Sequence, residues 1–99
     1  MKFKEGVKVF GIRQEALLIL MCAETVWARQ GEEVVCTSVV DGSHSVASLH
    51  FAGCAVDLRI WGLDVEKAAA ELREALTDEY DVVVEADHIH VEYQPKRGQ

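Results

Sequence analysis

The stretch Ala-Val-Asp-Leu-Arg-Ile-Trp at residues 55–61 decides the fold. Val56 and Leu58 alternate with Asp57 and Arg59, and a glycine follows the stretch. Alternation with a period of two is typical of a strand that buries one face and leaves the other polar. We therefore expect a strand here whose outward face carries a carboxylate and a guanidinium.

A second strand and a polar loop precede this stretch. Residues 33–39 are rich in Val and Thr, which favour extended backbone. Asp-Gly-Ser at residues 41–43 then breaks the pattern and opens a polar loop that runs through Ser48.

Two helices are predicted on either side of these strands. Apolar residues recur at helical spacing over residues 12–29, and Gly31 follows as a stop signal. Asp64 is a candidate N-cap for a second helix whose apolar face extends to about Thr77.

The chain ends in two more strand-like runs. Residues 81–85 and 89–93 are joined by a turn at residues 86–87. Helix, strands, helix and strands in this order predict an α+β fold with a mainly antiparallel sheet packed with two helices. We expect a single domain over residues 1–95, followed by a tail at residues 96–99.

Composition narrows the classes of function. The 99 residues suit one small core, and 49% hydrophobic residues are typical of a globular domain. The net charge of −7, with basic residues gathered near the two ends, disfavours nucleic-acid binding. Three widely spaced cysteines without a CxxC pair indicate a reducing compartment rather than a disulfide framework.

One apolar run near the N-terminus has some features of a secretion signal. It covers residues 16–23, and Glu15 and Glu24 bracket it. The run is too short to span a bilayer, and a core helix is the better interpretation. We therefore expect no membrane insertion, no signal peptide and synthesis in the cytoplasm.

Two clusters carry His and Asp residues that could bind a metal ion. The first is Ser-Leu-His-Phe-Ala-Gly-Cys-Ala-Val-Asp at residues 48–57, and the second is Asp-His-Ile-His-Val-Glu-Tyr at residues 87–93. Catalytic zinc takes three protein ligands from His and carboxylates and keeps a fourth position for water. Two ligands from one cluster and one from the other would meet this requirement.

Strand geometry favours part of such a site. His88 and His90 are two residues apart, so they project from one face of their strand, as Asp57 and Arg59 do from theirs. Asp87 is expected in the turn that enters the last strand. Spacing alone leaves two alternatives open, a metal site or a histidine pair with a structural or solvated role.

The two clusters resemble a known signature. SLHFAGCAVD is similar to the S-x-H-x-x-G-x-A-x-D motif of the zinc D-alanyl-D-alanine carboxypeptidases and dipeptidases. DHIHVEY is similar to the second motif of that family, in which an acid lies three residues before a zinc histidine. The family includes phage L-alanyl-D-glutamate endolysins and shares its zinc site with hedgehog signalling domains, so the resemblance implies the hedgehog/DD-peptidase fold.

The resemblance implies a role for each matched residue. His50, Asp57 and His90 would bind one Zn²⁺. Asp87 would be the general base, and His88 would donate a hydrogen bond to the oxyanion of the tetrahedral intermediate. The implied activity is hydrolysis of peptidoglycan stem peptides, as a D-Ala-D-Ala carboxypeptidase or an L-Ala-D-Glu-type endopeptidase.

Substrate recognition departs from the family pattern. Members that bind a free C-terminal carboxylate have an S-x-x-R-type element after the first strand, and residues 37–45 contain no arginine. His44 or Arg59 could take that role, and Ser48 could order the loop or contact substrate. The absence makes an endopeptidase relatively more plausible than a strict carboxypeptidase.

Two other hypotheses stay open. The chain could be a non-catalytic zinc-containing structural or binding module, for example one associated with a phage. It could also lack a metal altogether. For the peptidase, the expected partner is a peptidoglycan-derived peptide, reached from the cytoplasm through a virion or by release to the cell wall.

Overall fold

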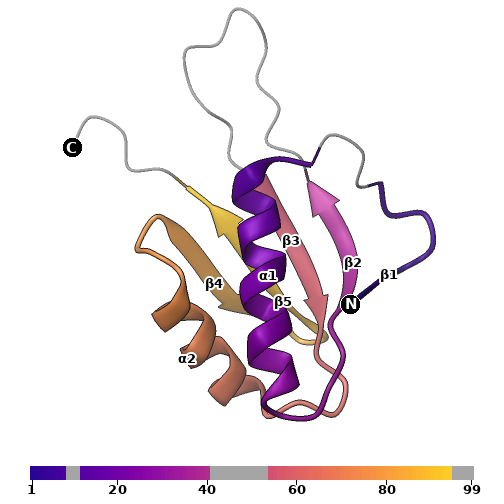
Figure 1. The fold of residues 1–99 in the computed structure, drawn as a ribbon, viewed down its shortest axis with the longest axis vertical. Coiled ribbons are helices and arrows are strands. Elements are labelled where there is room, and N and C mark those ends of the chain that lie inside the picture. Colours follow the sequence, from indigo (N-terminus) through magenta and orange to yellow (C-terminus); the bar gives the residue numbers. More distant parts are fainter. Residues whose placement is uncertain (9–11, 41–53, 95–99) are drawn as a thin grey trace, which may run out of the picture.

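A five-stranded mixed sheet forms the centre of the molecule. The computed structural model describes residues 1–8, 12–40 and 54–94. The elements along the chain are β1 (Lys2–Phe3), α1 (Gln14–Ala28), β2 (Val35–Val40), β3 (Cys54–Arg59), α2 (Val65–Ala75), β4 (Tyr80–Val84) and β5 (His88–Tyr93). The strands lie in the order β1-β2-β3-β5-β4 (Figure 1). All neighbours are antiparallel except β1 and β2.

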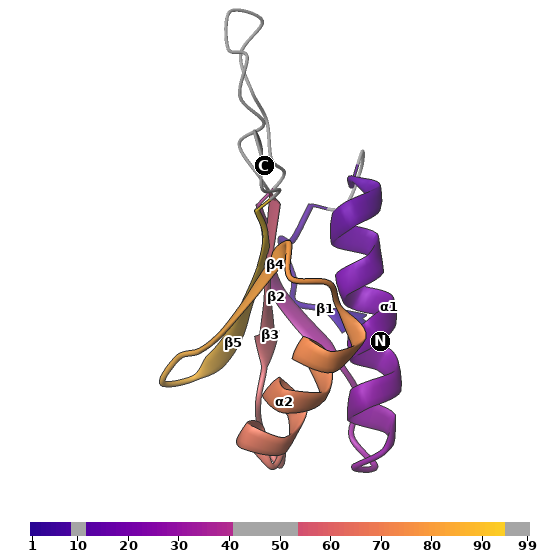
Figure 2. The same ribbon diagram turned by 90° about the vertical axis from the view of Figure 1, so that its left-hand side faces the viewer.

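Both helices cover the same face of the sheet (Figure 2). Side chains from α1, α2 and four strands form one hydrophobic cluster between these two layers. Cys54, Val56 and Leu58 of β3 face this cluster, and Ile89 and Val91 of β5 join them. The alternate residues of β3 and β5 therefore project from the opposite face, which no helix covers in the described part of the chain.

Helix α1 is apolar around most of its circumference. Ile19, Leu20 and Trp27 are fully buried against the sheet, whereas Leu17 and Met21 on the other side are exposed. The Trp27 indole also donates a hydrogen bond to the Arg59 carbonyl oxygen at 3.3 Å, which ties the helix to the end of β3. Gly31 follows α1 with a φ of 72°, a left-handed conformation that glycine adopts without steric cost.

Helix α2 begins as the sequence predicts. The Asp64 side chain accepts a hydrogen bond from the Lys67 backbone N–H at 3.2 Å, so Asp64 is the N-cap. Ala68, Ala69 and Leu72 form its buried face. The small alanines let the helix approach the sheet closely.

The predicted α+β class is confirmed, with two helices on a largely antiparallel sheet. Strand β1 was not predicted, and its parallel pairing with β2 makes the sheet mixed. Two residues are too few to show an alternating pattern, and their pairing depends on a distant strand. Among the described residues, no helix is long and apolar enough to cross a membrane.

Substitution of Leu72 by alanine tests the packing of α2. Because Leu72 is fully buried, we expect Leu72→Ala to lower the free energy of unfolding by about 2–5 kcal/mol. Met21→Ala, at a side chain that is 56% exposed, should change it by less than about 0.5 kcal/mol. Urea denaturation of both variants measures the difference, and equal effects would contradict the described core.

Thiol reactivity tests the strand positions independently. Burial raises the pKa of the Cys36 thiol to about 11, and Cys54 is also buried, whereas Cys22 is partly exposed. With a disulfide reagent at about pH 8, only Cys22 should react while the protein is folded. Denaturant should release the other two thiols. A Cys22→Ser variant that still shows a fast-reacting thiol would contradict the fold.

Candidate metal centre

The candidate site lies on the open face of the sheet, where β3 and β5 pair. In this antiparallel ladder Asp57 lies directly opposite His90, and Arg59 lies opposite His88. Glu92 lies two pairs further along on the same face, opposite Ala55. Directly opposed residues on one face have Cβ atoms about 4.5–5.5 Å apart, which is close enough for short polar side chains to meet.

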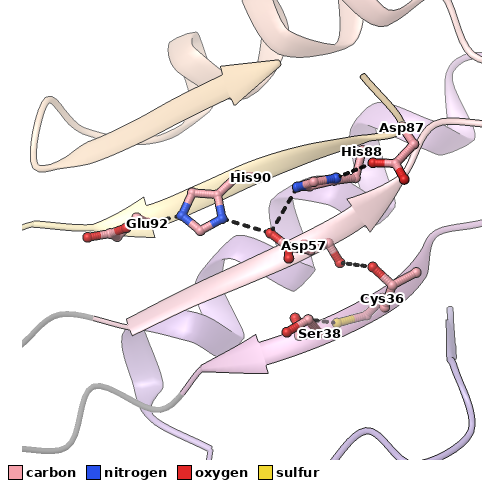
Figure 3. A network of polar contacts seen from close by, with 8 residues as sticks. Cys36, Ser38, Asp57, Asp87, His88, His90 and Glu92 are labelled. Atoms are coloured by element: carbon pink, nitrogen blue, oxygen red, sulfur yellow. Dashed lines mark hydrogen bonds and ion pairs between the residues drawn. The ribbon is translucent and has the colours of Figure 1, made fainter. Parts of the chain in front are cut away.

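Asp57 lies between two histidines and contacts both (Figure 3). Its Oδ1 lies 2.7 Å from Nδ1 of His90 and 3.6 Å from Nε2 of His88. The three side chains are between 27% and 30% exposed, so water reaches the group without surrounding it. Two imidazoles therefore converge on one partly shielded carboxylate.

Carboxylates flank this group at both ends. His90 Nε2 lies 3.0 Å from Glu92 Oε1, and His88 Nδ1 lies 2.6 Å from Asp87 Oδ1. Figure 3 shows the resulting chain of contacts from Glu92 through His90, Asp57 and His88 to Asp87. Each histidine thus has one nitrogen directed at Asp57 and the other at an outer carboxylate, which fixes the orientation of both rings.

The pKa values reflect these contacts. Burial alone would lower the pKa of His90, but its hydrogen bonds with Glu92 and Asp57 outweigh burial and raise the pKa. The hydrogen bond with His88 lowers the pKa of the Asp87 carboxyl. The pKa of Glu92 is also lowered, first by the Gln94 amide and then by His90. The site is therefore a place where positive charge is favoured.

The group has the donor set of a metal site. Asp57, His88 and His90 each offer one ligand atom, and these atoms all lie within 4.8 Å of one another. Two imidazole nitrogens and one carboxylate oxygen are ligands that zinc accepts. A cation between them would replace the proton of the Asp57–His90 hydrogen bond. The residues present therefore fit a metal ion.

The structure brings together some of the predicted site residues. Asp57 and His90, two of the three predicted ligands, are in contact. His88, predicted as an oxyanion donor, also lies within reach of Asp57. Asp87 lies in the turn that enters β5, as expected, and is 85% exposed.

The other predicted residues lie beside this group or outside the described part of the chain. Arg59 shares the face of Asp57 and lines a small pocket with His88 and Asp87. His44, Ser48 and the third predicted ligand, His50, lie outside the described residues.

Sequence reasoning missed His88 as a member of the group that could hold a metal. Its two-residue spacing from His90 on one strand was the available signal. Comparison of the chain with protein-family models, curated proteins and solved structures finds no match.

Metal binding depends on Asp57 and His90 if the site is as described. Asp57→Asn and His90→Asn should each weaken zinc affinity by at least about 100-fold, because each removes a ligand rather than a supporting contact. Asp81→Asn is the matched control, since Asp81 is an exposed carboxylate opposite Glu92 that lies outside the group. Competition with a chromophoric chelator gives the affinities. An equal loss in the control would show a diffuse acidic surface instead of a site.

Proposed function

We propose that the chain is a zinc-dependent peptidase that hydrolyses peptidoglycan stem peptides. The observation that carries the proposal is the cross-strand contact between Asp57 and His90, 2.7 Å between Oδ1 and Nδ1. These are the residues that the two sequence motifs share with the ligands of the D-alanyl-D-alanine metallopeptidases. Two motifs in separate parts of the chain thus meet at one point on the sheet.

Zinc would be held by Asp57, His90 and a third residue. The motif resemblance assigns the third position to His50. His88 is the alternative, because its Nε2 lies 3.6 Å from Asp57 Oδ1. When bound, zinc acts as a Lewis acid and lowers the pKa of a coordinated water to about 7.

Glu92 orients His90 for this role. It contacts Nε2 of His90 and so leaves Nδ1 directed at Asp57. A carboxylate behind a metal-binding histidine fixes the tautomer and makes the imidazole a stronger ligand. Glu92 is therefore a positioning residue in the proposal.

Asp87 and His88 supply the proton chemistry. The hydrogen bond with His88 lowers the pKa of Asp87. The ionised carboxylate is the state that can accept a proton from water and later return it to the leaving amine. Its contact with His88 Nδ1 favours a proton on that nitrogen. Nε2 of a neutral His88 then carries a lone pair and suits a ligand, whereas a protonated His88 could stabilise an oxyanion.

A non-catalytic zinc module is the second candidate. Within residues 1–8, 12–40 and 54–94 no helix covers the sheet face that carries the site, and Asp87, the proposed base, is 85% exposed. Catalytic groups work best where water is excluded, so this openness favours a binding or structural role. An intact acid beside the ligand set favours the peptidase.

Cleavage of defined muropeptides tests the proposal. Zinc-loaded protein should release new termini from stem peptides, and Asp87→Asn should lower the rate by about 10²–10⁴-fold while zinc stays bound. Glu85→Gln is the matched control, because Glu85 is a carboxylate in the same hairpin that is linked to His88 by a backbone hydrogen bond. Mass spectrometry of the products identifies the bond cut. Zinc-loaded protein that leaves every peptide intact from about pH 5 to about pH 9 would favour the non-catalytic module.

A further inference from the structure

A groove of about 530 Å³ lies between α1 and the paired ends of β4 and β5. Its α1 wall is made of Leu17, Leu18 and Met21, which are 43–56% exposed. Tyr80 and Tyr93 form the opposite wall, and they are partners in the β4–β5 ladder. Apolar side chains from two elements thus form a groove that is open to water.

The groove is separate from the candidate metal centre. Tyr93 and the buried Val91 project from one face of β5, whereas His90 projects from the other. Both helices lie on the face of Tyr93 (Figure 2). A ligand in the groove therefore does not touch Asp57 or His90.

Contacts with α1 hold the aromatic wall of the groove in place. The Tyr80 hydroxyl donates a hydrogen bond to the Glu15 carbonyl oxygen at 3.3 Å, which ties the start of β4 to the helix. The rings of Tyr80 and Tyr93 pack with their centroids 5.0 Å apart and their planes at 49°. Across from them, Met21 has a flexible thioether side chain that adapts its shape to what it contacts. The groove thus combines a pre-formed wall with an adaptable one.

The rim of the groove is negatively charged. Glu15 and Glu79 line it, and no lysine, arginine or histidine does so among the described residues. Burial and then the charge of Glu15 raise the pKa of Tyr80 to about 12. Burial, followed by the charges of Glu79 and Glu15, also raises the pKa of Tyr93. Both carboxylates therefore lie close enough to the aromatic wall to favour an occupant with positive charge.

We propose that this groove binds a basic amphipathic helix of a partner protein. The apolar face of that helix packs against the two tyrosines and against Leu17, Leu18 and Met21. Lysine or arginine side chains at its flanks pair with Glu15 and Glu79. The net charge of −7 on the whole chain attracts such a partner from a distance.

Other occupants match the groove less well. A small-molecule site buries at least about 70% of its ligand, whereas the half-exposed wall of α1 suits a larger partner. A second copy of this chain, docked through the same groove, would bring the like charges of Glu15 and Glu79 together. An anionic membrane surface would meet the same repulsion.

Methionine methyl NMR tests the proposal, because the two methionines of the chain lie in different places. Met21 lines the groove, whereas Met1 lies outside it, beside Glu24 and Glu33. The probe is a synthetic helical peptide of about 18 residues with leucines on one face and lysines along both flanks. One comparison peptide carries glutamate in place of lysine, and a second has the composition of the probe in scrambled order.

The lysine peptide should shift the Met21 methyl signal and leave the Met1 signal unchanged. The glutamate peptide and the scrambled peptide should bind at least about tenfold more weakly, because each lacks one half of the match. Added salt should weaken binding of the lysine peptide, since ion pairs at the rim are screened.

Variants of the protein locate the binding site. Glu15→Gln combined with Glu79→Gln should weaken binding by at least about fivefold, because it removes the charge of the rim. Leu18→Ala should have an effect of about the same size through lost apolar contact. The matched control is Glu66→Gln combined with Glu74→Gln, which removes the same charge from exposed positions on α2 outside the groove.

Equal binding of the lysine and glutamate peptides would overturn the proposal, as would an equal loss in the α2 variant or the absence of any Met21 shift. Benzyltrimethylammonium is added alone as a small apolar cation. Tighter binding of this cation than of the peptide would assign the groove to a small ligand instead. Co-sedimentation with vesicles of phosphatidylcholine and phosphatidylglycerol that Leu18→Ala abolishes would assign it to a membrane. None of these readouts requires zinc or peptide cleavage, so they are independent of the proposed function.

Discussion

The register between β3 and β5 is the constraint on which the site depends. It sets Asp57 opposite His90 and Arg59 opposite His88, so one ladder positions the carboxylate, both imidazoles and the guanidinium. A shift of β3 by one residue would turn Asp57 and Arg59 into the core and bring Val56 and Leu58 to the surface. Burial of those apolar side chains therefore fixes the register, and the hydrophobic core determines the geometry of the polar face.

Local sequence patterns predict most of this fold. Alternation in β3 and helical spacing in α1 each report which face is buried, and the cap at Asp64 marks the start of α2. Non-local pairing was not predictable in the same way. Strand β1 depends on β2, about thirty residues away, and the strand order depends on which edges meet once the helices have packed.

In the candidate site, too, local spacing was predictable and contacts between strands were not. Spacing predicted that His88 and His90 share a face and that Asp57 and Arg59 share another strand's face, and both are confirmed. Spacing could not show that His88 approaches Asp57, because that contact runs diagonally across two strands. The small pocket that Arg59 and His88 line together with Lys4 was missed for a similar reason, since Lys4 reaches it through the unpredicted pairing of β1. An acidic chain thus gathers two cations beside a group of carboxylates and imidazoles.

The most direct test of the account is a crystal structure of the zinc-loaded protein with anomalous scattering measured at the zinc absorption edge. The account predicts one strong anomalous peak on the open sheet face, about 2.0–2.2 Å from an Asp57 oxygen and a His90 nitrogen. The same map shows whether His50 or His88 completes the site. A peak bound by other residues, with the Asp57–His90 hydrogen bond intact, would contradict the account.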